Sequence, residues 1–315
     1  MRTKLLISSL TILFSLISIQ QIAIAHPWGG LVVDEDGNIY FTFTCPIVDE
    51  HHYACVWKLD TDGNLTQVLK SQNSPSDIIL ARSLNNQIYA AERSGQSPNY
   101  RNILWRLDAK VDPPYFDRVN SSDNFHIQTY AVADSATLYF ARDGNLYKTN
   151  NQSTVNEIET GYSFRRIDLL SFDSNGSLYL VADNNLYKQI DNEFELITQS
   201  LRKENPPNIP FHGANILFDM CVDENGTVYL AYYGNREILK VEQSGEISSF
   251  VTAEGPWSPS GIDIYNGELY ILESTIGDGA WWKFWQRNDD LLIPRIRKVD
   301  VEGKVSTLYE YQPVD

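Results

Sequence analysis

The sequence predicts an all-β protein, a six-bladed β-propeller with four antiparallel strands in each blade. The first observation behind this prediction is a repeat in which a branched apolar residue is followed by tyrosine. The repeat occurs six times, at Tyr40, Tyr89, Tyr139, Tyr179, Tyr229 and Tyr270. Successive tyrosines are 40 to 50 residues apart, and a period of this length is typical of one four-stranded propeller blade.

The second observation is a tight-turn signal shortly before each tyrosine, with an apolar strand ahead of the turn. The six signals are Asp36-Gly37-Asn38, Asn85-Asn86, Ser135-Ala136, Asn175-Gly176, Asn225-Gly226 and Asn266-Gly267. The third observation is a later apolar strand that ends on a basic residue in every repeat. These residues are Lys58, Arg106, Lys148, Lys188, Lys240 and Lys298. Together they predict roughly 24 strands and no sustained helix.

The blades are expected at about 27–71, 72–121, 122–160, 161–202, 212–252 and 256–312. The first blade opens with its own first strand and the last closes with its own fourth strand. No strand then needs to be exchanged between the ends of the chain, so the ring must close by packing between blades one and six. The repeated aromatic and basic residues are interpreted as residues that pack between blades or lie at solvated edges.

Residues 1–25 are predicted to be a signal peptide, followed by the propeller over 26–315. Arg2 and Lys4 precede an apolar run from Leu5 to Ile19, and Ala23-Ile24-Ala25 fits the small-x-small cleavage rule. The alternative, a membrane anchor, is disfavoured because the run is short for a bilayer span. We therefore expect a secreted or periplasmic monomer with no membrane span in the mature chain.

The formal charge of −16 argues against a nucleic-acid partner, because affinity for nucleic acids depends on an excess of lysine and arginine.

Three cysteines in an oxidising compartment leave one unpaired. Cys45 and Cys55 flank one hydrophilic loop and are predicted to form a disulfide. Cys221 lies in the apolar run 218–222 and is predicted to be an inert, buried thiol.

The long connections of the predicted blades all fall on one face, because successive strands of a blade are antiparallel. They are residues 45–55, 93–102, 200–211 and 274–294. Long loops on a rigid scaffold are where binding and catalysis concentrate, so a small molecule or peptide is expected on this loop-rich face. The predicted ligand contacts on this face are Trp28, Trp281, Trp282 and Trp285. The alternative is that the aromatic loop packs on neighbouring loops and acts as a structural plug.

Alignment of the first strands places His26, His126 and His212 in blades one, three and five. Alternate blades of a six-fold ring form a triangle around the axis, the arrangement that a metal with one open position requires. The sequence therefore predicts a divalent metal, zinc or copper, at the mouth of the central channel. A mature N-terminal His26 could also chelate copper alone. The alternative is that the three histidines form ordinary loop hydrogen bonds.

Arg165 and Arg166 occupy the corresponding position in blade four and are candidate catalytic residues, because a guanidinium can hold a carboxylate or an oxyanion. Structural pairing with one of the many acids is the alternative. Weaker candidates, interpreted as turn and edge residues, are Asp77, Glu92, Tyr162, Asp263 and Glu273.

The repeat openings His26-Pro27-Trp28-Gly29-Gly30-Leu31-Val32-Val33-Asp34 and Ser258-Pro259-Ser260-Gly261-Ile262-Asp263 resemble those of NHL-repeat and SMP-30-like six-bladed propellers. The three-histidine pattern is similar to that of the peptidyl-hydroxyglycine amidating lyases, whose channel histidines hold zinc. Only the three histidine positions carry over to this sequence. The resemblance implies a metal-dependent lyase or a lactone or ester hydrolase. The alternative is a non-catalytic propeller that binds a ligand or protein on its loop-rich face.

Overall fold

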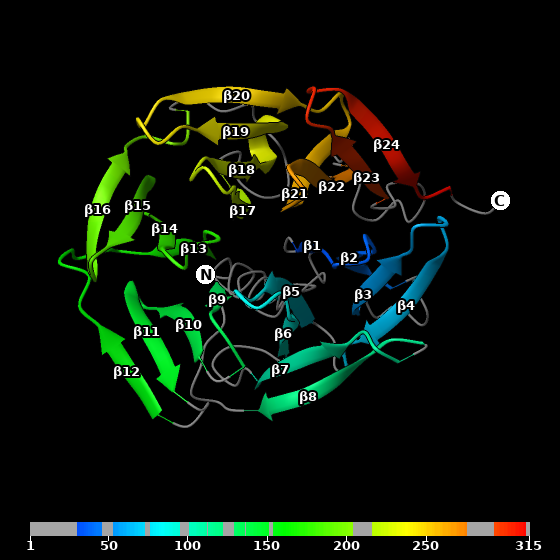
Figure 1. Ribbon diagram of the computed structural model, residues 1–315, viewed down its shortest axis with the longest axis horizontal. Coiled ribbons are helices and arrows are strands. Elements are labelled where there is room, and N and C mark those ends of the chain that lie inside the picture. Colours follow the sequence, from blue (N-terminus) through cyan, green and yellow to red (C-terminus); the bar gives the residue numbers. More distant parts are fainter. Residues whose placement is uncertain are drawn as a thin grey trace, which may run out of the picture.

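The computed structural model describes residues 30–45, 53–72, 76–94, 101–111, 113–121, 129–135, 137–150, 154–203, 216–275 and 293–312. These residues form six four-stranded sheets arranged as blades around a central axis (Figure 1). The predicted fold class, a six-bladed all-β propeller, is therefore confirmed. No helix in these ranges has the length and apolar character needed to cross a membrane.

The blades follow one another along the chain. Blade one contains β1 (Leu31–Val33), β2 (Ile39–Thr44), β3 (Ala54–Leu59) and β4 (Leu65–Lys70). Blade two contains β5 (Ser76–Arg82), β6 (Ile88–Ser94), β7 (Arg101–Asp108) and β8 (Tyr115–Ser121). Blade three contains β9 (Tyr130–Val132), β10 (Thr137–Arg142), β11 (Asn145–Asn150) and β12 (Thr154–Ile158).

Blade four contains β13 (Ile167–Phe172), β14 (Leu178–Ala182), β15 (Asn185–Ile190) and β16 (Glu193–Thr198). Blade five contains β17 (Leu217–Val222), β18 (Val228–Tyr232), the short 3₁₀ helix η1 (Tyr233–Asn235), β19 (Glu237–Val241) and β20 (Ile247–Thr252). Blade six contains β21 (Trp257–Tyr265), β22 (Glu268–Thr275), β23 (Pro294–Val299) and β24 (Val305–Glu310). The first strand of each blade lies nearest the axis (Figure 1).

Each sheet consists of four consecutive antiparallel strands, so no strand is exchanged between blades. The ring closes where blades one and six pack together, as predicted. One hydrophobic cluster joins Leu31 and Phe41 of blade one to Leu272 and Ile296 of blade six. The backbone at Gly30 lies so close to blade two that a Cβ there would be 2.7 Å from the Leu80 nitrogen.

The repeated tyrosine and the repeated basic residue face each other across the second and third strands of every blade. The six register pairs are Tyr40 with Lys58, Tyr89 with Arg106, Tyr139 with Lys148, Tyr179 with Lys188, Tyr229 with Lys240 and Tyr270 with Lys298. The Lys188 ammonium lies 5.0 Å from the centre of the Tyr179 ring, a cation–π distance. Burial raises the pKa of Tyr270 to about 12. The tyrosines are buried or half-buried and the basic residues are half-buried or exposed, which agrees with the interpretation as packing residues and solvated edges.

An aspartate begins several of the tight turns and explains their shape. Oδ1 of Asp34 accepts hydrogen bonds from the backbone N–H groups of Asp36 (3.0 Å) and Asn38 (2.8 Å). Gly37 supplies the positive φ of 83° that the turn requires. Asp173 accepts the equivalent pair of bonds in blade four. The turn chemistry therefore fixes the register of the inner strand against its neighbour.

The predicted disulfide between Cys45 and Cys55 is present, with the two Cα atoms 5.7 Å apart. It joins the residue after β2 to the second residue of β3. Cys221 is a free, buried cysteine in β17. Burial raises the pKa of the Cys221 thiol well above its usual value, as expected for an inert core position.

Candidate functional site: the central channel

A cavity of about 1080 Å³ runs along the axis of the ring and is lined by the six inner strands. At one end it is bounded by Thr129, Asp168 and Leu217, where inner strands begin. At the other end it reaches Glu35 and Glu224 in the turns that follow the inner strands. Cavities of roughly 300–1,000 Å³ or more hold small ligands in proteins, so the channel is the candidate functional site.

The described lining of the channel is strongly acidic. Its carboxylates belong to Glu35, Asp168, Asp173, Asp219, Asp223, Glu224, Asp263 and Asp300. The basic side chain in this lining is Arg82. A channel lined by charge of one sign and enclosed by protein focuses the electric field along its axis. The cavity therefore favours positively charged groups.

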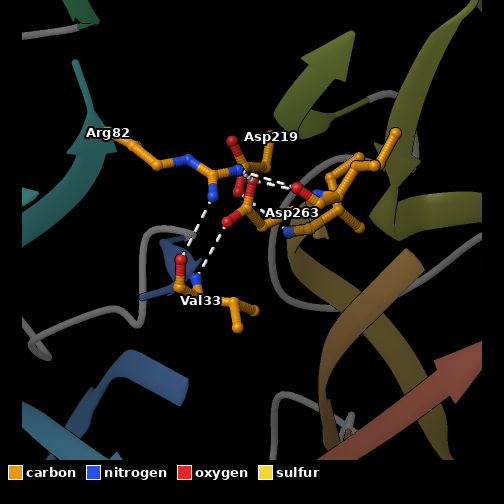
Figure 2. A network of polar contacts seen from close by, with 6 residues as sticks. Val33, Arg82, Asp219 and Asp263 are labelled. Atoms are coloured by element: carbon orange, nitrogen blue, oxygen red, sulfur yellow. Dashed lines mark hydrogen bonds and ion pairs between the residues drawn. The ribbon is translucent and has the colours of Figure 1, made fainter. Parts of the chain in front are cut away.

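Arg82, at the end of β5, joins three blades inside the channel (Figure 2). Its Nη2 lies 2.6 Å from Oδ1 of Asp263 in blade six. Its Nη1 donates to the carbonyl oxygen of Val33 in blade one (3.2 Å), and the Val33 N–H donates to Oδ2 of Asp263 (2.9 Å). Burial raises the pKa of Asp263, and the Arg82 charge opposes that rise.

Asp219 lies beside this network on β17, in blade five (Figure 2). Its Oδ1 accepts a hydrogen bond from the Met220 N–H, and its Oδ2 accepts one from the Ile262 N–H, both at 2.9 Å. The structure shows no ion pair between Asp219 and any lysine or arginine in the described ranges. Burial, with the nearby Asp263 charge as a lesser cause, raises the pKa of Asp219 to about 8.

A local irregularity places Asp219 in this position. The register between β17 and β18 shifts between Leu217 and Asp219, so that the inner strand carries one extra residue. The sequence contains one signal of this site, an acidic residue within an otherwise apolar inner strand. The apolar residues of the run 218–222 predict only a buried strand, and no local pattern marks Arg82.

Four of the five weaker sequence candidates lie in strands and not in turns. Asp77 and Asp263 lie in β5 and β21, which are the inner edge strands of their sheets. Glu92 is fully buried in β6 and accepts a hydrogen bond from Nε1 of Trp105 (3.0 Å). Glu273 is fully buried in β22 and pairs with Arg295 and Arg297. Arginines from another blade or from the neighbouring strand compensate the buried charges of Asp263 and Glu273, which a reading of one segment at a time does not reveal.

Arg165 and Arg166 immediately precede β13, at the end of the channel where the inner strands begin. Their backbone N–H groups donate to the carboxylate of Asp183, at 2.8 and 3.2 Å. The Arg166 guanidinium pairs with Asp168, although 61% of the Arg166 side chain is exposed. Arg202 also contacts Asp168 (2.7 Å). Since Asp168 lines the cavity, Arg166 lies next to the channel mouth.

The other predicted site residues lie outside the described residues: His26, His126, His212, Trp28, Trp281, Trp282 and Trp285. Within the described ranges, no three His, Cys, Asp or Glu side chains are grouped to hold a metal ion. The strands that follow the three histidines are β1, β9 and β17, the inner strands of alternate blades (Figure 1). Ser258, the equivalent position in blade six, is buried and donates a hydrogen bond to the Tyr233 carbonyl oxygen (2.8 Å).

No protein-family model and no curated protein matches this chain. Among solved structures, it is similar to a streptogramin B lyase, with 14% identity and a TM-score of 0.52 over 93% of this chain and 86% of that one. It is also similar to virginiamycin B lyase from Staphylococcus aureus, with 12% identity and a TM-score of 0.51 over 92% and 86%. The PQQ-bound aldose sugar dehydrogenase of Streptomyces coelicolor has 13% identity and a TM-score of 0.51 over 86% and 92%. Such low identities show a shared propeller fold alone.

Proposed function

We propose that this protein binds a small molecule or peptide at the end of the channel where its inner strands begin. The observation that carries the proposal is the cavity of about 1080 Å³ that reaches this end. The connections that the sequence marks as long also leave the blades on this side, because the strands that precede them end there. The site then combines a concave wall with neighbouring loops, as small-molecule sites commonly do.

Arg166 is the proposed contact for an acidic group of the ligand. Its pairing with Asp168 holds the side chain near the mouth. Because the side chain is also exposed and a guanidinium has five N–H donors, other N–H groups can contact a ligand. Asp183 fixes the backbone of Arg165 and Arg166. A guanidinium forms two parallel hydrogen bonds with a carboxylate. The expected ligand therefore carries a carboxylate that contacts Arg166 at the exposed mouth, outside the acidic lining of the channel.

A second candidate function is a metal-dependent lyase or a lactone or ester hydrolase. It is supported by the position of β1, β9 and β17 as inner strands of alternate blades, because His26, His126 and His212 precede these strands in the sequence. These three residues would hold zinc or copper. Such an ion, when bound, lowers the pKa of its water or polarises a carbonyl group. Arg165 and Arg166 would orient the substrate carboxylate.

Export of the protein is part of the same proposal. Residues 1–25 have the composition of a signal peptide. The Cys45–Cys55 disulfide is compatible with an oxidising compartment. Sequencing the N-terminus of the protein recovered from its native compartment tests export, with His26 as the expected first residue.

Calorimetric titration with N-acetylglycine and with gluconate, two small carboxylates, tests the binding proposal. Arg166→Gln should bind either probe about tenfold more weakly, because one charge-assisted contact is lost. Arg106→Gln is the matched control, since Arg106 is an exposed arginine of β7. Equal affinity in Arg166→Gln and wild type would contradict the proposed contact.

Elemental analysis tests the metal proposal. The purified protein should contain about one zinc or copper per chain, and His126→Ala should lose most of it, since three ligands are needed to hold the ion. His51→Ala is the control because His51 is not one of the three proposed ligands. Unchanged metal content in His126→Ala would remove the enzyme candidate and leave the binding function.

A further inference from the structure

The middle of the channel contains a carboxyl group that the binding proposal above does not use. Asp219 lines the cavity, and its hydrogen bonds within the described part of the chain come from backbone N–H groups. Its neighbour Asp263 differs, because Arg82 pairs with it at 2.6 Å. The two acids therefore differ in compensation, because Asp263 has a cationic partner and Asp219 has none among the described residues.

The hydrogen bonds of Asp219 leave part of its capacity free. A carboxylate can accept about four hydrogen bonds, two at each oxygen. Each oxygen of Asp219 accepts one, from Met220 or from Ile262. A donor in the cavity can therefore reach both oxygens without displacing a backbone contact.

Further acids continue from Asp219 toward the end of the channel where the turns follow the inner strands. Asp223, Glu224 and Glu35 line that end, whereas Asp168 at the opposite end is already paired with Arg166 and Arg202. Arg82 is already used by Asp263, Val33 and Ile264. A ligand that matches this pattern is elongated and carries several positive charges in a row.

We propose that the channel binds a linear organic polyamine, with one ammonium group on the carboxylate of Asp219. An ammonium has three donors and is satisfied by a few acceptors. A calcium ion needs six to eight oxygen ligands at about 2.3–2.6 Å, and no group of three metal-ligating side chains occurs in the described ranges. This proposal uses the same cavity as the proposed function, and it rests on that function only through the shared cavity.

The bound ammonium competes with a proton, because Asp219 must be ionised to accept it and its pKa is raised to about 8. Polyamine binding near neutral pH should therefore release a proton and strengthen as the pH rises toward 8. The titratable and charged groups around Asp219 come from β5, β9, β13, β17 and β21. They are Arg82, Tyr130, Asp168, Cys221, Asp223 and Asp263.

Isothermal titration of the full chain with spermidine tests the proposal. At pH 8, Asp219→Asn should bind spermidine about tenfold more weakly than wild type, because one ion pair is lost. Glu195→Gln, an exposed position on β16, removes the same charge outside the channel and should bind like wild type. Titrations of wild type in two buffers of different ionisation enthalpy should show proton release at pH 7. This second measurement does not depend on the folding of a variant.

Three results would overturn the proposal. They are the absence of spermidine binding, equal affinity in Asp219→Asn and wild type, and complete displacement of spermidine by an equal concentration of calcium chloride. The last result would identify a metal site instead. Loss of spermidine binding leaves the carboxylate titrations with Arg166→Gln unaffected, so the failure of this inference and the failure of the proposed function are distinguishable.

Discussion

Arg82 has a structural role that depends on residues far away in the sequence. Its partner Asp263 is 181 positions further along the chain, and Val33 is 49 positions earlier. The guanidinium compensates a buried carboxylate and at the same time satisfies carbonyl oxygens of two other blades. Removal of one member of such a group is costly because the remaining charge stays buried.

Arg82→Ala should lower the free energy of unfolding by about 3 kcal/mol, because Asp263 loses its counter-charge. The double variant Arg82→Ala/Asp263→Asn should recover part of this loss, since the unpaired carboxylate is also gone. Urea unfolding monitored by tyrosine and tryptophan fluorescence gives both values. Arg106→Ala serves as the surface control and should change stability by less than about 0.5 kcal/mol. A double variant less stable than Arg82→Ala alone would contradict this account.

The candidate site could be predicted only in small part from single residues. Arg166 is a candidate from the sequence, and the structure places it next to Asp168, a lining residue of the channel; its role as a site residue stays a prediction. Asp219 and Arg82 were missed because their significance comes from blades two, five and six meeting at the axis. The only local signal was a charged residue within an apolar inner strand. Pairing of such residues is a tertiary property that periodicity does not reveal.

The strands and turns were far more predictable than the site. Each repeat contains its own turn aspartate or asparagine, its own tyrosine and its own basic partner, and all of these act within one sheet. Interactions within each repeat therefore determine the strands and turns of its blade. The register shifts in β13, β17 and β21 were not anticipated, because a bulge depends on how neighbouring inner strands meet.

The cysteines of blades one and five differ in oxidation state, because Cys45 and Cys55 form a disulfide and Cys221 is a free thiol. Native protein should give almost no reaction with a thiol reagent, because Cys221 is buried in β17 and its pKa is raised. Unfolding in guanidinium chloride without reductant should expose one thiol per chain, since Cys45 and Cys55 are bonded. Unfolding with prior reduction should expose all three. Three reactive thiols without reductant would contradict the disulfide.

The molecule as a whole contains buried acids near its axis, and these should determine how its stability depends on pH. An acid whose pKa is raised by folding binds more protons in the folded state than in the unfolded state. Its contribution is then fully present at low pH and is lost as the pH rises through the folded-state value. Asp219, with a pKa of about 8, should therefore reduce stability progressively between about pH 4 and pH 8.

Urea unfolding at pH 5, 6.5 and 8 checks this expectation. The free energy of unfolding of Asp219→Asn should fall less with pH than that of wild type. The stability of the variant relative to wild type should therefore rise with pH. Asp60→Asn is the contrasting control, because hydrogen bonds from Asn64 lower the pKa of Asp60. The contribution of Asp60 then changes only below about pH 4, so the curve of this variant should run parallel to wild type from about pH 5 to 8. Parallel pH curves for wild type and Asp219→Asn would show that Asp219 is not protonated in the folded state.

The completeness of each blade also bears on how such a ring can change in evolution. Among the described strands, no hydrogen-bonded ladder crosses from one sheet to the next. Duplication or deletion of a gene segment encoding four consecutive strands would leave every remaining sheet whole. Such an event would alter only the number of units around the ring and the width of the hole between them, and with it the size of molecule that the centre admits.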